Sequence, residues 1–321
     1  MQDSRITTTI VLRMRVLPCS SRLNLTVRRP IFFPMSGHTK SPVYGARSRR
    51  KNSNVPARVS AAVSKSPATN QHDPSEYHEE LQSAYRALKA CRSDSWSTRR
   101  DDLDQCPATV KTTLRRLELL MAMSELNKRR VLLLGDDDLL CVALSAAGVS
   151  APITVVDLDR SLLSRIARWT KTGTVELVHH DLRLGLPGTM AGCYDVVFTD
   201  PPYTAAGQLL FLRAGLIALR NNRSASLFLC ASRLYLRPEQ IERIIGAAEH
   251  AGFQLSSVAE DYNEYKAPPD VIKDIRQRQG HSKPYLYSSL FHFKPRADIL
   301  DPESLPFSPA EIYEYEEENG R

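Results

Sequence analysis

The sequence lacks the cysteine spacings, the glycine-rich loop and the long apolar runs that would identify several common protein classes. Its six cysteines are scattered without a CxxC pair, so neither a zinc site nor a disulfide framework is indicated, and a reducing compartment is the default. There is no GxGxxG motif, which argues against nicotinamide and flavin dinucleotides. The most apolar long stretch, 206–219, is interrupted by Arg213 and is too short to span a bilayer. We therefore expect no metal and no membrane association.

Acidic residues are almost absent from the first 70 positions. Residues 1–70 hold 13 Lys or Arg and one acid, whereas residues 71–321 hold 30 Lys or Arg and 35 Asp or Glu, so a basic tail precedes a mildly acidic remainder. An Arg-rich, Ser-rich and acid-poor tail is typical of an organelle transit peptide. It also fits upstream sequence from a wrongly assigned start, or a disordered arm that binds nucleic acid. We expect a cytoplasmic protein, or one of the mitochondrial or plastid matrix if the tail is a transit peptide.

The chain after this tail divides into three parts. Residues 71–128 carry two amphipathic helical patterns, at 76–92 and 108–126, and we expect them to form a small helical lead-in that caps the edge of the main sheet. Residues 129–296 form the main domain. Residues 297–321 form an acidic C-terminal tail, which we expect to be flexible.

Short β-rich runs alternate with helical patterns throughout the main domain. Continuous apolar strands separated by helices predict a parallel sheet that is covered on both faces. The predicted strands are 130–134, 153–157, 174–178, 194–200, 225–231, 253–258 and 285–293. The predicted helices are 138–147, 160–171, 205–220 and 238–251. A polar insertion, 260–284, replaces the helix before the last strand, which we therefore expect to be antiparallel. The predicted fold class is α/β, with a doubly wound, seven-stranded, mostly parallel Rossmann-like sheet of the class I methyltransferase type.

An acid follows each of the first four predicted strands. These acids are Asp136, Asp137 and Asp138 after Gly135, then Asp157, Asp181 and Asp200. Ligands of doubly wound sheets bind outside the carboxyl ends of the strands, near the point where the strand order reverses. A single acid at such a place often only caps the next helix. Four successive strand ends that carry acids are better explained by a ligand.

Two of these acids have positions that indicate a nucleoside. Asp157 lies 22 positions beyond Gly135, near the roughly 20-residue offset at which an acid binds ribose hydroxyls. Asp181 is placed to accept a hydrogen bond from an adenine amino group, and its alternative role is to cap a helix. Asp159 has capping of the helix that starts at Arg160 as its simplest role.

The three consecutive aspartates indicate the charge of the ligand. They would repel a pyrophosphate, and they would equally repel the carboxylate of S-adenosylmethionine. Decarboxylated S-adenosylmethionine carries an ammonium group and a sulfonium instead, so repulsion becomes attraction. The alternative is that one aspartate caps the helix and the other two complement its dipole.

The fourth strand ends in Asp200-Pro201-Pro202-Tyr203. This motif resembles motif IV of the methyltransferases that act on the amino groups of adenine or cytosine. In those enzymes the acid and a prolyl carbonyl accept hydrogen bonds from the target amine, and the aromatic ring stacks on the base. The motif indicates attack by an amine on a sulfonium, and a turn after a strand is its structural alternative.

Over residues 102–260 the chain resembles the N4-bis(aminopropyl)spermidine synthase family, the branched-chain polyamine synthases. The likeness rests on the lead-in DLDQCPATVKTTLRRLELL and on VLLLGDDDLLCVAL, VVDLD, HHDLR and TDPPYT. The residues that match the family's motifs are Gly135, Asp136, Asp137, Asp138, Asp157, Asp181, Asp200, Pro201, Pro202 and Thr204. The resemblance implies aminopropyl transfer from decarboxylated S-adenosylmethionine to spermidine, with Asp138 and Asp200 near the reacting amines. In the family the position of Tyr203 is often acidic, and tyrosine there is closer to the methyltransferase motif.

These observations lead to one expected function and two alternatives. We expect aminopropyl transfer from decarboxylated S-adenosylmethionine to a spermidine-like amine, without a metal, which gives branched polyamines. The expected catalytic residues are Asp138, Asp200 and Tyr203, and the expected cofactor-binding residues are Gly135, Asp136, Asp137, Asp157, Asp181 and Pro201. The alternatives are an S-adenosylmethionine-dependent methyltransferase of an amino group in nucleic acid, protein or a small molecule, and a non-catalytic binding protein. The acidic remainder argues for a polyamine acceptor and against nucleic acid. A homodimer is one oligomeric state that we consider.

Overall fold

The structure is a computed structural model that describes residues 78–93, 100, 103, 105–171, 173–267, 272 and 285–296. The predicted basic tail, 1–70, and the predicted acidic tail, 297–321, lie outside the described residues. No helix of the described part is long and apolar enough to cross a membrane.

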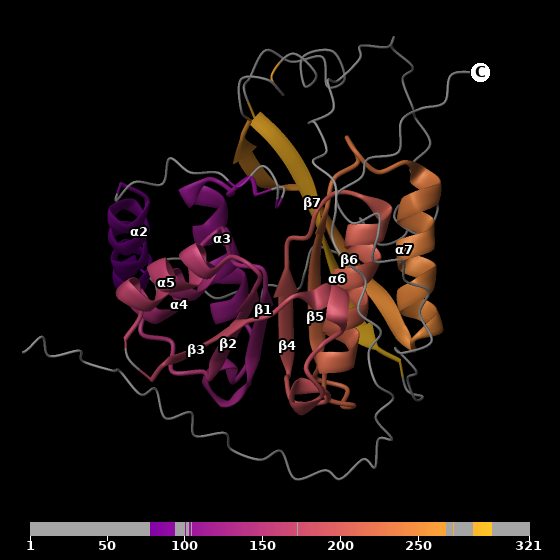
Figure 1. The fold of residues 1–321 in the computed structure, drawn as a ribbon, viewed down its shortest axis with the longest axis horizontal. Helices are drawn as coiled ribbons and strands as arrows, with labels where there is room; N and C mark the ends of the chain where they lie inside the picture. The colour runs from indigo at the N-terminus through magenta and orange to yellow at the C-terminus, as the bar shows by residue number, and fades with distance from the viewer. Residues whose placement is uncertain are drawn as a thin grey trace, which may run out of the picture. The chain divides into compact units, whose positions relative to one another are not determined.

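A seven-stranded sheet forms the centre of the described part (Figure 1). The strands are β1 (Val131–Leu134), β2 (Ile153–Asp157), β3 (Val175–His179), β4 (Val196–Thr199), β5 (Ser226–Ala231), β6 (Phe253–Lys266) and β7 (Tyr285–Pro295). Their order in the sheet is β3-β2-β1-β4-β5-β7-β6. The pairs among β1 to β5 are parallel, and β7 runs antiparallel to both β5 and β6. The predicted fold class and the antiparallel last strand are confirmed.

Helices cover both faces of the sheet, because the strands are apolar on both sides. The helices are α2 (His78–Ser93), α3 (Val110–Met121), α4 (Leu140–Ala146), α5 (Arg160–Trp169), α6 (Ala205–Ala218) and α7 (Pro238–His250), with short 3₁₀ turns η3 (Leu126–Lys128), η4 (Leu182–Leu184) and η5 (Gly188–Met190). In β1, Leu132 and Leu134 pack into the core under α6 and α7, whereas Val131 and Leu133 pack into the core under α2 to α5. This alternation follows from the two-residue period of a strand. Figure 1 shows the two groups of helices on opposite sides of the sheet.

The lead-in contacts the edge strand β6, as we expect, through a bridge between Ala108 and Tyr265, but its helices also extend over one face of the sheet. Leu88 of α2 and Leu117 of α3 belong to the same core as the inward-facing residues of β1, β2 and α4. Both helices therefore cover a face of the sheet, together with α4 and α5 (Figure 1). The apolar stripes of α2 and α3 were visible in the sequence, but the surface that they cover depends on how the chain returns over the sheet.

The prediction of a polar insertion at 260–284 is wrong for its first residues. Residues 260–266 continue β6, which pairs with β7 as far as Lys266. Register shifts between Leu255 and Ser257 and between Ala259 and Asn263 absorb extra residues in β6, and this is how a bulged strand bends without ending. The bulges break the two-residue pattern by which a strand is recognised in a sequence. Most of the remaining insertion lies outside the described residues.

Candidate active site

The carboxyl ends of β1, β2, β3 and β4 lie side by side at one end of the sheet, because these four strands are adjacent and parallel. The N–H of Asp136 donates to the Asp157 carboxylate at 3.3 Å, which joins the ends of β1 and β2. Thr199 at the end of β4 donates through its hydroxyl to the Leu134 carbonyl at 2.8 Å, which joins β4 to β1. Gly135 turns the chain here with a φ of 71°, a value that favours glycine.

Asp136 caps the helix that follows it. Its two carboxylate oxygens accept from the N–H groups of Leu140 at 2.7 Å and Cys141 at 3.1 Å, at the start of α4. Burial raises the pKa of the Asp136 carboxyl group to about 7, although these hydrogen bonds oppose the rise. The structural alternative that we considered for the three aspartates therefore describes Asp136.

Asp138 is bound on all sides by the protein. Its carboxylate accepts from the Ala108 N–H and forms an ion pair with Arg116 of α3. Its backbone carbonyl accepts from Arg92 at 2.9 Å and from the Thr113 hydroxyl at 3.2 Å. Asp138 is buried, and these contacts use its carboxylate within the fold.

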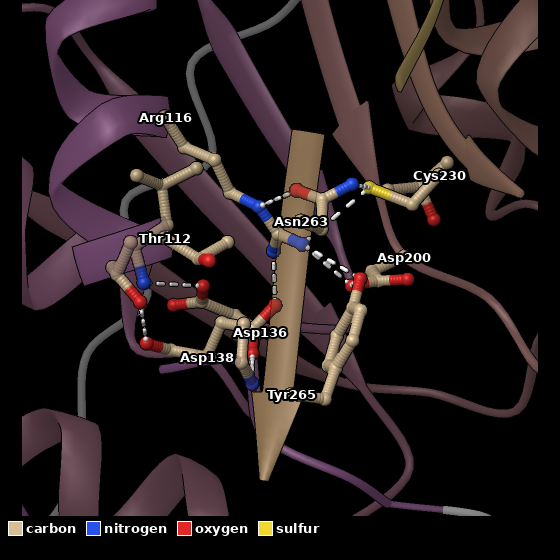
Figure 2. A network of polar contacts seen from close by, with 12 residues as sticks. Thr112, Arg116, Asp136, Asp138, Asp200, Cys230, Asn263 and Tyr265 are labelled. Carbon is tan, nitrogen blue, oxygen red and sulfur yellow. Dashed lines mark hydrogen bonds and ion pairs between the residues drawn. The ribbon is translucent and has the colours of Figure 1, made fainter. Parts of the chain in front are cut away.

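Arg116 connects the ends of β1 and β4 (Figure 2). Its side chain is 1% exposed, and Nη2 donates to Asp200 at 2.7 Å while Nη1 contacts Asp138. Nε donates to the side-chain oxygen of Asn263 in β6 at 2.9 Å. The Tyr265 hydroxyl accepts from Nη2 at 3.0 Å. One buried guanidinium thus neutralises part of the charge of two strand-end acids.

Asp200 lies between this guanidinium and two phenols. Oδ2 accepts from the Tyr265 hydroxyl at 2.6 Å as well as from Arg116. Oδ1 lies 3.0 Å from the Tyr203 hydroxyl, and that hydroxyl also lies 2.8 Å from the Tyr265 hydroxyl. Burial raises the pKa of the Asp200 carboxyl group, and Arg116 opposes this rise. The carboxylate is held firmly, and Oδ1 keeps acceptor capacity for a further donor.

Tyr203 is packed inside a small aromatic cluster. The residue is 8% exposed. Its ring stacks on that of Tyr235 with centroids 6.2 Å apart and makes an edge-on contact with the ring of Tyr265. Through its hydroxyl Tyr203 contacts Asp200, so it supports the acid by hydrogen bonding. Its ring is not presented as an open platform for a base. Pro201, which precedes this cluster, is buried, and Thr204 caps α6 by accepting from Gly207 N–H.

Asp137 differs from its two neighbours. Its side chain is partly exposed, and within the residues that the structure describes its carboxylate makes no hydrogen bond or ion pair. Burial raises the pKa of Asp137 well above its usual value, and the nearby charges of Asp138, Asp200 and Asp157 raise it further. Asp137 therefore lies where a cation would be strongly favoured.

The end of β2 carries one acid with free acceptor capacity and one that is fully used. Asp157 accepts from the N–H groups of Asp136 and Asp159, and burial raises its pKa to about 6. Each of its oxygens keeps a lone pair for a hydroxyl donor. Asp159 caps α5 by accepting a hydrogen bond from the Ser161 N–H at 2.8 Å, and its position before the helix predicts this role.

Asp181 is occupied by a neighbouring arginine. It caps η4 by accepting from the Arg183 N–H, and the Arg183 guanidinium binds both of its oxygens, with Nη2 at 2.7 Å. This is the capping role that the sequence offers as the alternative for Asp181. An adenine amino group would have to replace the guanidinium of Arg183 to reach this carboxylate.

The sequence did not reveal three residues of this network, namely Arg116, Asn263 and Tyr265. Arg116 occupies a position on the buried stripe of α3, where Thr113, Leu117 and Leu120 are also buried. A charged residue in the apolar phase of a helix was the available signal. Asn263 and Tyr265 carried no such signal, because they lie in the part of β6 that resembles a polar loop. Among the described residues no cluster of His, Cys, Asp and Glu is suited to hold a metal ion.

Comparison with known proteins gives a family and a fold. Residues 90–282 match the model of the branched-chain polyamine synthase A C-terminal domain. An uncharacterized protein of Methanocaldococcus jannaschii is 32% identical over 177 residues, which are 53% of this chain and 44% of that protein. The N(4)-bis(aminopropyl)spermidine synthase of the same organism is 33% identical over 130 residues, which are 40% of this chain and 37% of that protein. This chain therefore spans less than half the length of these curated relatives.

A solved structure has a similar fold. The branched-chain polyamine synthase from Thermus thermophilus, crystallised in complex with N4-aminopropylspermidine and 5'-methylthioadenosine, superposes with a TM-score of 0.61. The match covers 70% of this chain and 67% of that chain, at 22% sequence identity. At this identity the likeness supports the fold.

Proposed function

The chain belongs to the branched-chain polyamine synthase A C-terminal domain family, and we propose that it transfers an aminopropyl group to an amine of a polyamine. The proposed donor is decarboxylated S-adenosylmethionine, and the proposed acceptor is spermidine-like, which gives a branched product. The relative that is named N(4)-bis(aminopropyl)spermidine synthase supports this acceptor class by analogy.

The proposal depends mainly on the environment of the Asp137 carboxylate. It is partly exposed, it lies among other acids, and it makes no ion pair within the described part of the chain. Arg116 and Arg92 both interact with it electrostatically, but Arg116 binds Asp138 and Asp200, and Arg92 binds the carbonyls of Ala108 and Asp138. This arrangement favours a ligand that carries a positively charged ammonium group.

The same arrangement disfavours a carboxylate. At about 4 Å, one pair of unit charges is worth roughly 4 kcal/mol at an effective dielectric constant of about 20. An ammonium group would keep Asp137 ionised and gain this attraction, whereas the carboxylate of S-adenosylmethionine would be repelled unless Asp137 took up a proton. Neither Arg116 nor Arg92 is presented to it, because their guanidinium groups are already bound within the fold. We therefore propose that the site selects the donor that lacks the carboxylate.

The nucleoside of the donor is proposed to lie along the ends of β1, β2 and β3. Asp157 would accept the two ribose hydroxyls with its remaining lone pairs, next to the backbone turn at Gly135 and Asp136. Asp181 would accept from the adenine amino group once Arg183 moves aside. A crystal structure of the Thermus thermophilus protein holds 5'-methylthioadenosine, the nucleoside that aminopropyl transfer leaves behind, and this supports the choice of a thioether nucleoside as probe.

The attacking nitrogen is proposed to bind at Asp200, beside Pro201 and Tyr203. The nitrogen lone pair attacks the aminopropyl carbon next to sulfur, the carbon–sulfur bond breaks, and its electron pair remains on sulfur as the neutral thioether. The product nitrogen then loses its proton to water. Asp200 can accept one hydrogen from the acceptor amine through Oδ1, which holds the nitrogen in line with the sulfonium. The step needs no covalent enzyme intermediate.

The donor preference tests this proposal. We expect calorimetric titration of the full chain to show decarboxylated S-adenosylmethionine binding at least about tenfold more tightly than S-adenosylmethionine, a difference of about 1.4 kcal/mol. Asp137→Asn should abolish this preference and leave the affinity for 5'-methylthioadenosine unchanged. Mass spectrometry of a reaction with spermidine would then identify the aminopropylated product. Tighter binding of S-adenosylmethionine by the wild-type protein would contradict the proposal.

The methyltransferase alternative rests on Tyr203, because Asp-Pro-Pro-Tyr matches the motif of amino-group methyltransferases. The buried position of the Tyr203 ring weakens this alternative, since a base needs an exposed ring on which to stack. Methylated product from S-adenosylmethionine, with no product from the decarboxylated donor, would establish it.

A further inference from the structure

We propose that Arg116 is a positioning residue of this site, which fixes the Asp200 carboxylate for the acceptor nitrogen and cancels the charge of Asp138. The inference rests on the aminopropyl transfer proposed above, because it assigns Asp200 to the acceptor. Arg116 itself has no role in contacting the substrate, since its side chain is 1% exposed.

The geometry of the guanidinium supports this role. Its three nitrogens donate in three directions, with Nε to Asn263, Nη1 to Asp138 and Nη2 to Asp200. The planar group has one orientation in which all three partners are satisfied, so Asp200 is held at a defined place relative to Asp138. Figure 2 shows the guanidinium between the Asn263 amide and the Asp200 carboxylate.

The helix that carries Arg116 is attached to the strand that carries Asn263. The Thr109 N–H donates to the Glu264 carbonyl at 2.7 Å, and the Glu264 N–H donates to the Thr112 hydroxyl at 2.9 Å. Arg115 donates to the Tyr262 carbonyl at 2.8 Å and lies over its ring. The start of α3 is therefore fixed on β6, and the position of Arg116 is set by the backbone around it.

The charges explain why a cation is needed. Asp138 and Asp200 both contact one buried guanidinium, and two nearby buried carboxylates cannot both stay ionised without it. Burial already raises the pKa of Asp200, and Arg116 opposes that rise. Other titratable or charged groups also act on Asp138, Asp200 or Arg116. They are Arg92, Asp136, Asp137, Tyr203, Cys230, Tyr262 and Tyr265.

The first test measures stability and does not depend on the reaction. Removing the cation in Arg116→Gln raises the pKa of the Asp200 carboxyl group in the folded protein further above its unfolded value, because Arg116 no longer opposes the effect of burial. An acid with a raised folded pKa loses folding stability as the pH rises, so the melting temperature of Arg116→Gln relative to wild type should fall between about pH 5 and about pH 8. Arg115→Gln is the matched control on the same helix, because Arg115 contacts Tyr262 and no acid of the site. Its shift relative to wild type should be the same at both pH values.

The second test follows the reaction. In Arg116→Gln the acidic limb of the kcat/KM profile should move to higher pH, because Asp200 must be ionised to accept from the amine. Arg116→Lys keeps the charge and loses the planar fork, so its acidic limb should stay in place while kcat falls at least about tenfold. In both variants the affinity for 5'-methylthioadenosine should match that of wild type.

The outcomes separate this inference from the proposed function. Equal, pH-independent shifts in Arg116→Gln and Arg115→Gln would overturn the role of Arg116, whatever the reaction is. If Arg116→Gln does not fold, Arg116→Lys with an unchanged kcat would also overturn it. A wild-type protein that transfers no aminopropyl group would refute the proposed function, while the stability test would still decide whether Arg116 serves the two acids.

Discussion

The hydroxyl of Tyr265 donates a 2.6 Å hydrogen bond to the carboxylate of Asp200, across 65 positions of sequence. Asp200 follows β4, the middle strand of the sheet. Tyr265 lies near the end of β6, which is an edge strand. The long, bulged β6 brings this phenol back to the strand ends where the acids gather. The acid of the Asp-Pro-Pro-Tyr motif is therefore supported by a strand that the motif does not include.

This hydrogen bond predicts an effect of Tyr265→Phe. A hydrogen bond to a charged group contributes about 1.5–3 kcal/mol, so we expect kcat/KM to fall roughly tenfold to a hundredfold. Burial raises the pKa of Asp200 and the Tyr265 hydroxyl opposes the rise, so the acidic limb of the pH profile should also move to higher pH. Tyr262→Phe is the control, because the Tyr262 hydroxyl donates to the Arg115 carbonyl outside this network. An equal loss in both variants would argue against a specific role for Tyr265.

The buried ion pair of Asp138 predicts a loss of stability in Asp138→Asn. Removing one partner of a buried pair typically costs about 3–5 kcal/mol, because the remaining charge is left without compensation. Urea denaturation of the purified variant measures this cost. Glu125→Gln, in the exposed pair with Lys128, should leave the unfolding midpoint unchanged. An Asp138→Asn protein of wild-type stability would show that the pair contributes little.

The Asp136 carboxyl group predicts a dependence of stability on pH. Its pKa is raised by burial from 3.8 to about 7, so the folded protein holds this proton more tightly than the unfolded chain. The associated stability is complete below the unfolded pKa and is lost as the pH rises toward about 7. Asp136→Asn cannot ionise, so its melting temperature relative to wild type should rise from about pH 4 to about pH 8. A difference that is constant over this range would contradict the assignment.

The pairing of Asp181 with Arg183 predicts opposite results for the two residues. Asp181→Ala should weaken binding of 5'-methylthioadenosine about tenfold, because an adenine amino group loses its acceptor. Arg183→Ala should not weaken it, since that side chain occupies the carboxylate in the absence of the nucleoside. Calorimetry with the uncharged nucleoside measures both. If Arg183→Ala binds as weakly as Asp181→Ala, the pair is structural and adenine does not contact Asp181.

The strand ends were well predicted by the sequence, because they depend on local patterns. Continuous apolar runs such as 131–134 and 153–157 can be buried only in a sheet that is covered on both faces, and the turn at Gly135 follows directly. The order of the strands then brings Asp157 and Asp200 to the same edge. The capping role of Asp159 also follows from its position before an amphipathic helix.

The three consecutive aspartates make different contacts, and these differences depend on the tertiary structure. Asp136 caps α4, Asp138 pairs with Arg116, and Asp137 makes no such contact within the described residues. Three identical side chains in a row have the same local propensities, so the sequence cannot distinguish them. The turn after β1 points each of the three side chains in a different direction. Helix α3, which carries Arg116, lies on the side to which Asp138 points.

The doubly wound sheet and the acids at the ends of its strands therefore follow from local patterns in the amino-acid sequence. Which of these acids are neutralised depends on the folded structure, because their partners Arg116 and Tyr265 come from a helix and a strand that are far apart in the sequence. Apolar periodicity is a local property of a chain, and it is read from a few neighbouring residues. The pairing of buried charges depends on contacts between distant segments, and these exist only once the fold has formed.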